Sequence, residues 1–191
     1  MKGFLLVISG PTAAGKGTIV KEILKKRDDI VASISVTTRY QRENEIDGVD
    51  YFFKTQKEFD ELIETNKLLE HAVVHGNSYG TPIAFVEKSI NEGKVVILEI
   101  DVQGASQVRQ NFENAVYIFM LPPKKSDIEA RLRHRNTESE EMIQTRLRNA
   151  EVELAQIRYY DYFLINDYVD KATKKLEEII DEELEKRREE C

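Results

Sequence analysis

Apolar residues occur in short continuous runs, separated by longer stretches in which apolar residues recur every three or four positions. A short apolar run is typical of a strand buried on both faces of a sheet, and the longer spacing is typical of an amphipathic helix. Alternation of the two predicts an α/β fold with a parallel sheet flanked by helices. The predicted strands run from Phe4 to Ile8, Val95 to Ile100, Val116 to Leu121 and Tyr162 to Ile165.

Several helical stretches begin with residues that favour helix starts. Ser126 with Glu129, and Ser139 with Glu140 and Glu141, supply hydrogen-bond acceptors and negative charge to a first turn. The predicted helices run from about Thr18 to Lys26, Lys57 to Asn66, Ile83 to Glu92, Ser106 to Asn111, Ser126 to Arg135, Ser139 to Arg158 and Asp170 to Glu185.

Two stretches depart from the alternation of strand and helix. Residues 34–81 hold segments typical of short strands at Tyr51 to Phe53, Leu68 to Val74 and Ser78-Tyr79 around one helix, which predicts an inserted α+β subdomain. Residues 124–145 are rich in arginine and acidic residues, as expected of a mobile lid. A single domain is therefore expected, with its core formed by residues 1–33, 82–123 and 146–191.

Composition narrows the functional classes. A chain of 191 residues with 41% hydrophobic residues is long enough for a substantial core. The net charge of −7 disfavours nucleic acid and anionic membranes as partners. No run reaches membrane-spanning length, and a single cysteine, Cys191, excludes an intramolecular disulfide. A cytoplasmic protein is expected, and its oligomeric state and protein partners stay open.

A glycine-rich segment stands between the first predicted strand and the first predicted helix. Gly10 and Gly15 permit backbone angles that turn successive N–H groups inward around a phosphate chain, and Lys16 adds a positive charge. This order predicts a phosphate-binding P-loop. The residues expected to bind ATP are Gly10, Pro11, Thr12, Ala13, Ala14, Gly15, Lys16, Gly17 and Thr18.

A second group of motifs lies within and after the predicted insertion. It comprises Ser35-Val-Thr37-Thr38-Arg39-Tyr-Gln-Arg42, Asp47-Gly48-Val-Asp50-Tyr51, Glu70, Gly76-Asn77-Ser78-Tyr79-Gly80-Thr81, Leu98-Glu-Ile-Asp101-Val-Gln-Gly104, Arg131-Leu-Arg-His-Arg135, Arg146-Leu147 and Asn166-Asp167. Together with the P-loop, these motifs resemble guanylate kinase over nearly the whole chain. The resemblance implies the P-loop nucleoside monophosphate kinase fold and a transfer of the γ-phosphoryl group from ATP to GMP, giving ADP and GDP, in purine metabolism.

The resemblance assigns the GMP phosphate to Arg39, Arg42, Tyr51 and Tyr79. Guanidinium groups suit a compact dianion because their planar donors bind two oxygens at once. The resemblance assigns the guanine base to Glu70. This is chemically reasonable because a carboxylate accepts the neighbouring N1–H and amine donors that adenine lacks. The resemblance places the remaining base contacts at Ser35 and Thr81, and leaves Asp101 open between the guanine amine and a magnesium-bound water.

No residue needs to act as a nucleophile, because the acceptor oxygen belongs to GMP. The expected catalytic groups neutralise charge on the transferred phosphoryl group and close the site to water. The resemblance assigns these catalytic roles to Lys16, Arg39, Arg131, Arg135 and Arg146, and it adds Asn166 to the residues expected to bind ATP.

Three positions depart from the family pattern. Gly17 stands where a hydroxyl normally faces Mg²⁺, so Thr18 is the expected metal contact, directly or through water. Gln41 replaces a proline in the arginine motif, and Asn136 replaces a glycine after the lid arginine. Neither of these two changes removes a charged group.

Alternative functions differ in motifs. A GTPase would account for Asp101-Val-Gln-Gly104 but requires a base-reading NKxD motif that Asn166-Asp167 does not provide. A kinase for another nucleoside monophosphate fits the GKGT ending of the loop, although Glu70 and the Thr-Thr-Arg motif disfavour it. A non-catalytic module that binds phosphorylated peptides typically lacks the phosphate-binding residues present here.

Overall fold

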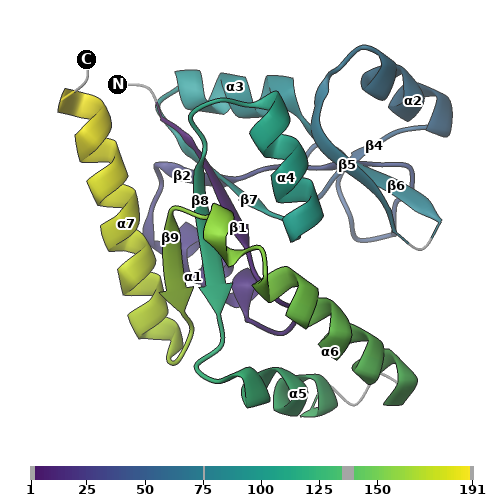
Figure 1. The fold of residues 1–191 in the computed structure, drawn as a ribbon. Helices are drawn as coiled ribbons and strands as arrows, with labels where there is room; N and C mark the ends of the chain where they lie inside the picture. Colours follow the sequence, from purple (N-terminus) through teal and green to yellow (C-terminus); the bar gives the residue numbers. More distant parts are fainter. Residues whose placement is uncertain (1–2, 75, 135–139, 190–191) are drawn as a thin grey trace.

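A computed structural model describes residues 3–74, 76–134 and 140–189, and it contains a five-stranded main sheet in the order β2-β7-β1-β8-β9 (Figure 1). Every pairing in it is parallel, which confirms the predicted α/β class. The sequence did not predict β2, because it is a three-residue edge strand with one fully buried position. The strands are β1 (Leu5–Ser9), β2 (Ile30–Ala32), β7 (Val95–Glu99), β8 (Val116–Leu121) and β9 (Tyr162–Ile165).

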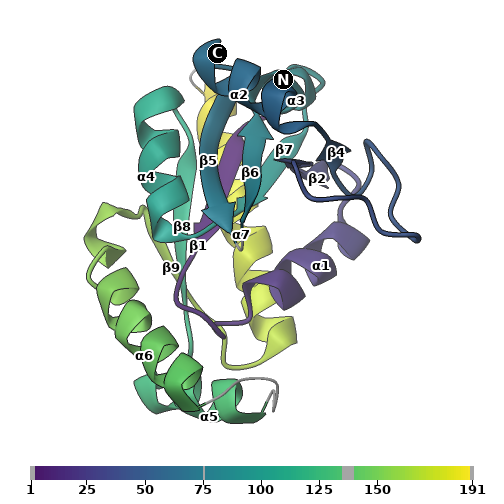
Figure 2. The same ribbon diagram turned by 90° about the vertical axis from the view of Figure 1, so that its right-hand side faces the viewer.

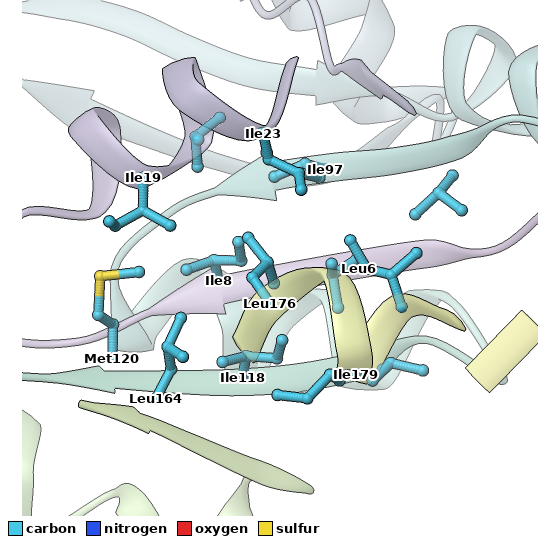
Figure 3. Packing of buried hydrophobic residues seen from close by; sticks show 14 of the residues in the cluster. Leu6, Ile8, Ile19, Ile23, Ile97, Ile118, Met120, Leu164, Leu176 and Ile179 are labelled. Atoms are coloured by element: carbon cyan, nitrogen blue, oxygen red, sulfur yellow. The ribbon is translucent and has the colours of Figure 1, made fainter. Parts of the chain in front are cut away.

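Helices cover both faces of this sheet (Figure 1). Helices α1 (Lys16–Lys26) and α7 (Val169–Glu189) lie on one face, where Ile8 packs with Ile19 and Leu176 (Figure 3). The opposite face carries α3 (Ile83–Asn91) and α4 (Val102–Asn111). Since alternate residues of a strand face opposite ways, burial of both faces favours apolar residues, and β1 is apolar from Leu5 to Ile8. All five of its residues, including the polar Ser9, are buried.

A separate four-stranded sheet in the order β4-β3-β6-β5 lies between Val36 and Pro82, to one side of the main sheet (Figure 1). Phe59 of its helix is buried in a small core with Val36 and Leu68. The two-residue strand β3 was not predicted, because so short a strand leaves no periodic pattern. The elements are β3 (Val36–Thr37), β4 (Phe52–Phe53), α2 (Gln56–Glu64), β5 (Leu68–Val74) and β6 (Asn77–Pro82).

Two helices follow β8 and lie beside the P-loop (Figure 2): α5 (Lys125–His134) and α6 (Glu140–Leu154). The predicted helix start at about Ser126 is confirmed to within one residue, since α5 begins at Lys125. The side chain of Asp127 accepts a hydrogen bond from the Lys124 N–H at this start, at 3.2 Å. The predicted start at Ser139 lies outside the described residues.

Three helices have one end that lies four residues from its predicted position. Helix α4 begins at Val102 rather than Ser106, because the Asp101 carboxylate caps it through the N–H groups of Gln103 and Gly104 at 2.9 and 2.8 Å. Helix α6 ends at Leu154, and a 3₁₀ turn (Ile157–Tyr159) replaces the predicted last turn. Helix α7 continues to Glu189.

Glu183 fastens α7 to the edge strand β9. Its carboxylate accepts hydrogen bonds from the Tyr162 hydroxyl at 2.7 Å and the Lys186 ammonium at 2.9 Å, and it pairs with Arg187. Burial alone would raise the pKa of Glu183, but these hydrogen bonds outweigh it and lower the pKa to about 2. The ionised carboxylate is therefore favoured in the folded protein.

We expect Glu183→Gln to lower the free energy of unfolding at pH 7 by about 1–3 kcal/mol, because Arg187 and Lys186 lose a buried anionic partner. The loss should shrink as the pH falls below about 4, since wild-type Glu183 then becomes protonated in the unfolded chain. Urea denaturation at pH 7 and below about pH 4 measures the free energy of unfolding of wild type and variant. Glu178→Gln, which removes only an exposed ion pair with Lys175, should change stability by less than about 0.5 kcal/mol. Equal losses in the two variants would contradict the anchoring role.

Candidate active site

The P-loop connects β1 to α1 and lines a cavity of about 430 Å³. Gly15 has φ 89°, and a Cβ atom there would lie 2.3 Å from the Asn166 amide nitrogen, so only glycine fits. The buried Asn166 side chain in turn donates to the Ala14 carbonyl at 2.8 Å. The cavity is lined by Thr12, Ala13, Ala14, Gly15, Lys16, Gly17, Thr18, Lys21 and Glu99.

The Lys16 side chain bends back over its own loop. Its ammonium donates to the carbonyls of Gly10 and Pro11 at 2.6 and 3.3 Å. These neutral acceptors hold the charge at the mouth of the cavity, where an incoming phosphate oxygen would be a stronger partner.

Glu99, at the end of β7, was not singled out from the sequence. A Cβ atom at Gly17 would lie 3.4 Å from the Glu99 carboxylate, so the missing side chain at position 17 leaves the carboxylate its space. Partial burial raises the pKa of Glu99, and the charges of Lys16 and Lys21 oppose the rise. Glu99 and the exposed Thr18 thus present oxygen atoms to the same cavity.

Two of the predicted lid arginines contact the loop. Arg131 donates to the Ala13 and Ala14 carbonyls at 3.2 and 3.3 Å, and to the Asn166 carbonyl at 3.2 Å. Arg146 donates to the Thr12 hydroxyl at 3.3 Å. The third predicted lid arginine, Arg135, lies outside the described residues, as does Asn136.

A buried carboxylate marks the region predicted to bind the base. Glu70 on β5 is 8% exposed and accepts a hydrogen bond from the Thr81 hydroxyl on β6 at 2.7 Å. Gly104 lets the first turn of α4 approach, since a Cβ atom there would lie 3.3 Å from Glu70. Burial raises the pKa of Glu70, the Thr81 hydroxyl opposes the rise, and the nearby charge of Asp101 adds to it.

The predicted phosphate-binding residues form a second basic cluster. The Arg39 guanidinium lies 5.4 Å from the centre of the Tyr51 ring, and that ring lies 6.1 Å from the ring of Tyr79. Glu45, which the sequence did not single out, pairs with Arg39 at 2.7 Å and also accepts the Arg42 N–H at 2.9 Å. Hydrogen bonds to Glu45 and Tyr79 raise the pKa of Arg39.

Arg42 and Ser35 contact this region through backbone groups. Arg42 lies on the exposed segment between β3 and β4, where its backbone N–H donates to Glu45 and its charge helps to lower the pKa of that carboxyl group. Ser35 precedes β3 and is half-buried, and its carbonyl accepts the Phe52 N–H at 2.9 Å. No local sequence pattern distinguishes Glu45 or Glu99, because their contacts are with residues that only the fold brings near them.

A family model described as guanylate kinase matches residues 2–183. The chain belongs to the guanylate kinase family. A guanylate kinase of Clostridium perfringens is 49% identical over 94% of this chain and 83% of its own length, and one of Bacillus anthracis is 49% identical over 94% and 88%. Membership in the guanylate kinase family decides against the GTPase alternative.

The fold agrees with this assignment. A crystal structure of guanylate kinase from Anaplasma phagocytophilum aligns with a TM-score of 0.71 at 32% identity, covering 95% of this chain and 86% of that one. The P-loop nucleoside monophosphate kinase fold is therefore confirmed. Within the described residues, no helix is both long and apolar enough to cross a membrane.

We expect Glu70→Gln to raise the melting temperature of the ligand-free protein by a few degrees at pH 8, because the variant removes the cost of an ionised buried carboxylate. The raised pKa of Glu70 means that this cost is absent near pH 4 and grows as the pH rises through the folded-state pKa. Melting curves at pH 4 and pH 8 measure the difference, with Glu64→Gln on the exposed end of α2 as the control. A stability gain that did not increase with pH would argue against desolvation as its cause.

Proposed function

We propose that this chain transfers the γ-phosphoryl group of ATP to GMP with the residues described above. Guanylate kinase membership gives the activity, an ATP:GMP phosphotransferase that forms ADP and GDP. The observation that supports the assignment of the site is the presence of two unlike groups of polar residues in one molecule. One is the P-loop with Lys16, and the other is the buried pair of Glu70 and Thr81 beside the first turn of α4.

Guanine selection rests on Glu70 in this proposal. Its two oxygens accept the N1–H and the exocyclic amine of guanine, while adenine would direct a lone pair at the same carboxylate. An unsatisfied buried carboxylate costs about 1–3 kcal/mol or more, so adenine is rejected. Thr81 holds the carboxylate in place, and Ser35 contributes to the base pocket. The proximity of Asp101 to Glu70 favours a role for Asp101 at the guanine amine over one at a magnesium-bound water.

The GMP phosphate binds at Arg39, Arg42, Tyr51 and Tyr79. Arg39 is already oriented by Glu45 and by the Tyr51 ring, so little side-chain entropy is lost when a phosphate arrives. The dianion then competes with Glu45 for the guanidinium group. Arg42, exposed on its loop, adds the second positive charge.

Transfer proceeds between ligands held in line, without a protein nucleophile. The loop amides from Gly10 to Thr18 and the neighbouring Asn166 shape the ATP phosphate site. Lys16, Arg131 and Arg146 neutralise charge on the transferred group, joined by Arg135. Residues 124–145 act as the lid, residues 34–81 as the GMP-binding insertion, and the remainder as the core, in a protein of the cytoplasm.

A magnesium ion bound with ATP would supply positive charge to the phosphate oxygens. The donors facing the loop cavity fit Mg²⁺, which prefers oxygen ligands and usually combines one or two carboxylates with phosphates and water. Glu99 and the Thr18 hydroxyl would hold it, directly or through water. Among the described residues there is no cluster of three or more histidine, cysteine or acidic side chains suited to a metal, so the nucleotide would contribute ligands of its own.

Base selectivity tests the proposal directly. In a coupled assay of ADP release, GMP should be turned over far faster than AMP, dTMP or UMP. Glu70→Gln should raise the KM for GMP by about 10- to 100-fold with little change in ATP binding, because glutamine turns a donor toward a guanine donor. Lys16→Ala should instead lower kcat. Comparable turnover of AMP by the wild-type protein would overturn the base assignment, and identical defects in both variants would overturn the separate roles.

Metal dependence tests the role of Glu99. Chelation with EDTA should abolish turnover, and Glu99→Gln should raise the Mg²⁺ concentration needed for half-maximal activity about tenfold, because a carboxylate ligand or its water partner is lost. Glu92→Gln, on the exposed end of α3, should leave the Mg²⁺ titration unchanged. A Glu99→Gln titration identical to wild type would exclude Glu99 from the metal site.

A further inference from the structure

Helix α6 contacts one residue of the P-loop, Thr12, through two of its side chains. Arg146 donates to the Thr12 hydroxyl, and the Glu153 carboxylate accepts the Thr12 backbone N–H, each at 3.3 Å. Arg146 and Glu153 are seven positions apart, close to two helical turns, so both lie on the same face of α6. Between them, Ala150 is 2% exposed and belongs to a small apolar cluster against which Ala13 of the loop packs. The contact is therefore a continuous interface between helix and loop.

Glu153 also lies in the field of the phosphate-binding lysine. Burial raises the pKa of its carboxyl group, while the charge of Lys16 and the hydrogen bond from Thr12 oppose the rise and the charge of Asp101 adds to it. Glu153 further lines a cavity of about 460 Å³ together with Asp101 and Gln103 at the start of α4. Its negative charge is thus located where the ATP side of the site meets the base side.

This carboxylate resembles a phosphate oxygen in what it contacts. It accepts an amide N–H of the P-loop and attracts Lys16, the two kinds of group that bind a polyphosphate in such loops. Lys16 meanwhile rests on the loop carbonyls. The loop therefore has protein partners for its donors before any nucleotide binds.

We propose that Glu153 is a positioning residue that takes the place of a phosphate oxygen at Thr12 and so aligns α6 with the nucleotide-free loop. This inference rests on the proposed function. When ATP binds, its phosphates take over Lys16 and the Thr12 amide, and the charge of Glu153 opposes them. The repulsion releases α6 from Thr12. Glu153 thereby lowers the affinity for the nucleotide and favours movement of the helix.

Nucleotide binding to the full chain tests this role. We expect Glu153→Gln, which keeps an acceptor but removes the charge, to bind ATP and ADP about three- to tenfold more tightly in calorimetry without GMP. The KM for ATP should fall while kcat also falls, because ADP leaves more slowly. Glu153→Asp, which keeps the charge, should restore an affinity close to wild type. Glu141→Gln, which removes a charge from the exposed surface of the same helix, should leave both constants unchanged.

The outcomes separate the two proposals. If Glu153→Gln bound ATP as wild type does, or more weakly, or if Glu141→Gln gained as much affinity, the role of Glu153 would be excluded. If Glu153→Asp bound ATP as tightly as Glu153→Gln does, the role of the charge would also be excluded, since the aspartate variant keeps it. If the wild-type protein bound ATP but did not phosphorylate GMP, the proposed function would fail instead.

Discussion

The geometry of the site depends on one buried side chain, that of Asn166. Its backbone N–H bonds to the Leu121 carbonyl at 2.8 Å, which fixes it at the ends of β8 and β9. Its side chain then supports the Ala14 carbonyl and occupies the space beside Gly15, while its own carbonyl receives Arg131. The sheet, the loop and α5 therefore meet at a single residue. A buried amide is suited to this task because an unsatisfied polar group there would be costly.

An acidic chain binds two polyanions here by pairing its cations locally. The net charge is −7, yet Arg39 faces Glu45, and Lys16 lies near Glu99 and Glu153. Under the proposed function, each carboxylate holds a cation in position while the ligand is absent and gives it up to a phosphate, which carries more charge and more acceptor oxygens. Specificity then comes from geometry, because the overall field of the protein repels anions that do not fit.

Local patterns in the sequence predicted the long buried strands, most helices and the P-loop, because each of these is encoded by contiguous residues. The pattern did not predict β2 and β3, which are too short to show periodicity. It also missed the first turn of α4, because Gly104 is atypical of a helix interior, although Asp101 caps this helix. It also missed Glu45, Glu99 and Glu153. Each is one acid among many in the sequence, and only its position beside Arg39 or Lys16 distinguishes it. The assignments of Glu70, Arg39 and the lid arginines to ligands stay predictions.

The continuity of α6 has a mechanical consequence. Helix α6 runs unbroken over 15 residues, from Glu140 to Leu154, and so crosses residue 145, where the predicted lid ends. At 1.5 Å per residue the helix is about 22 Å long, so a tilt of about 20° about Glu153 would displace the Glu140 end by about 7 Å. A small rotation beside the P-loop would therefore become a large movement at the far end of α6.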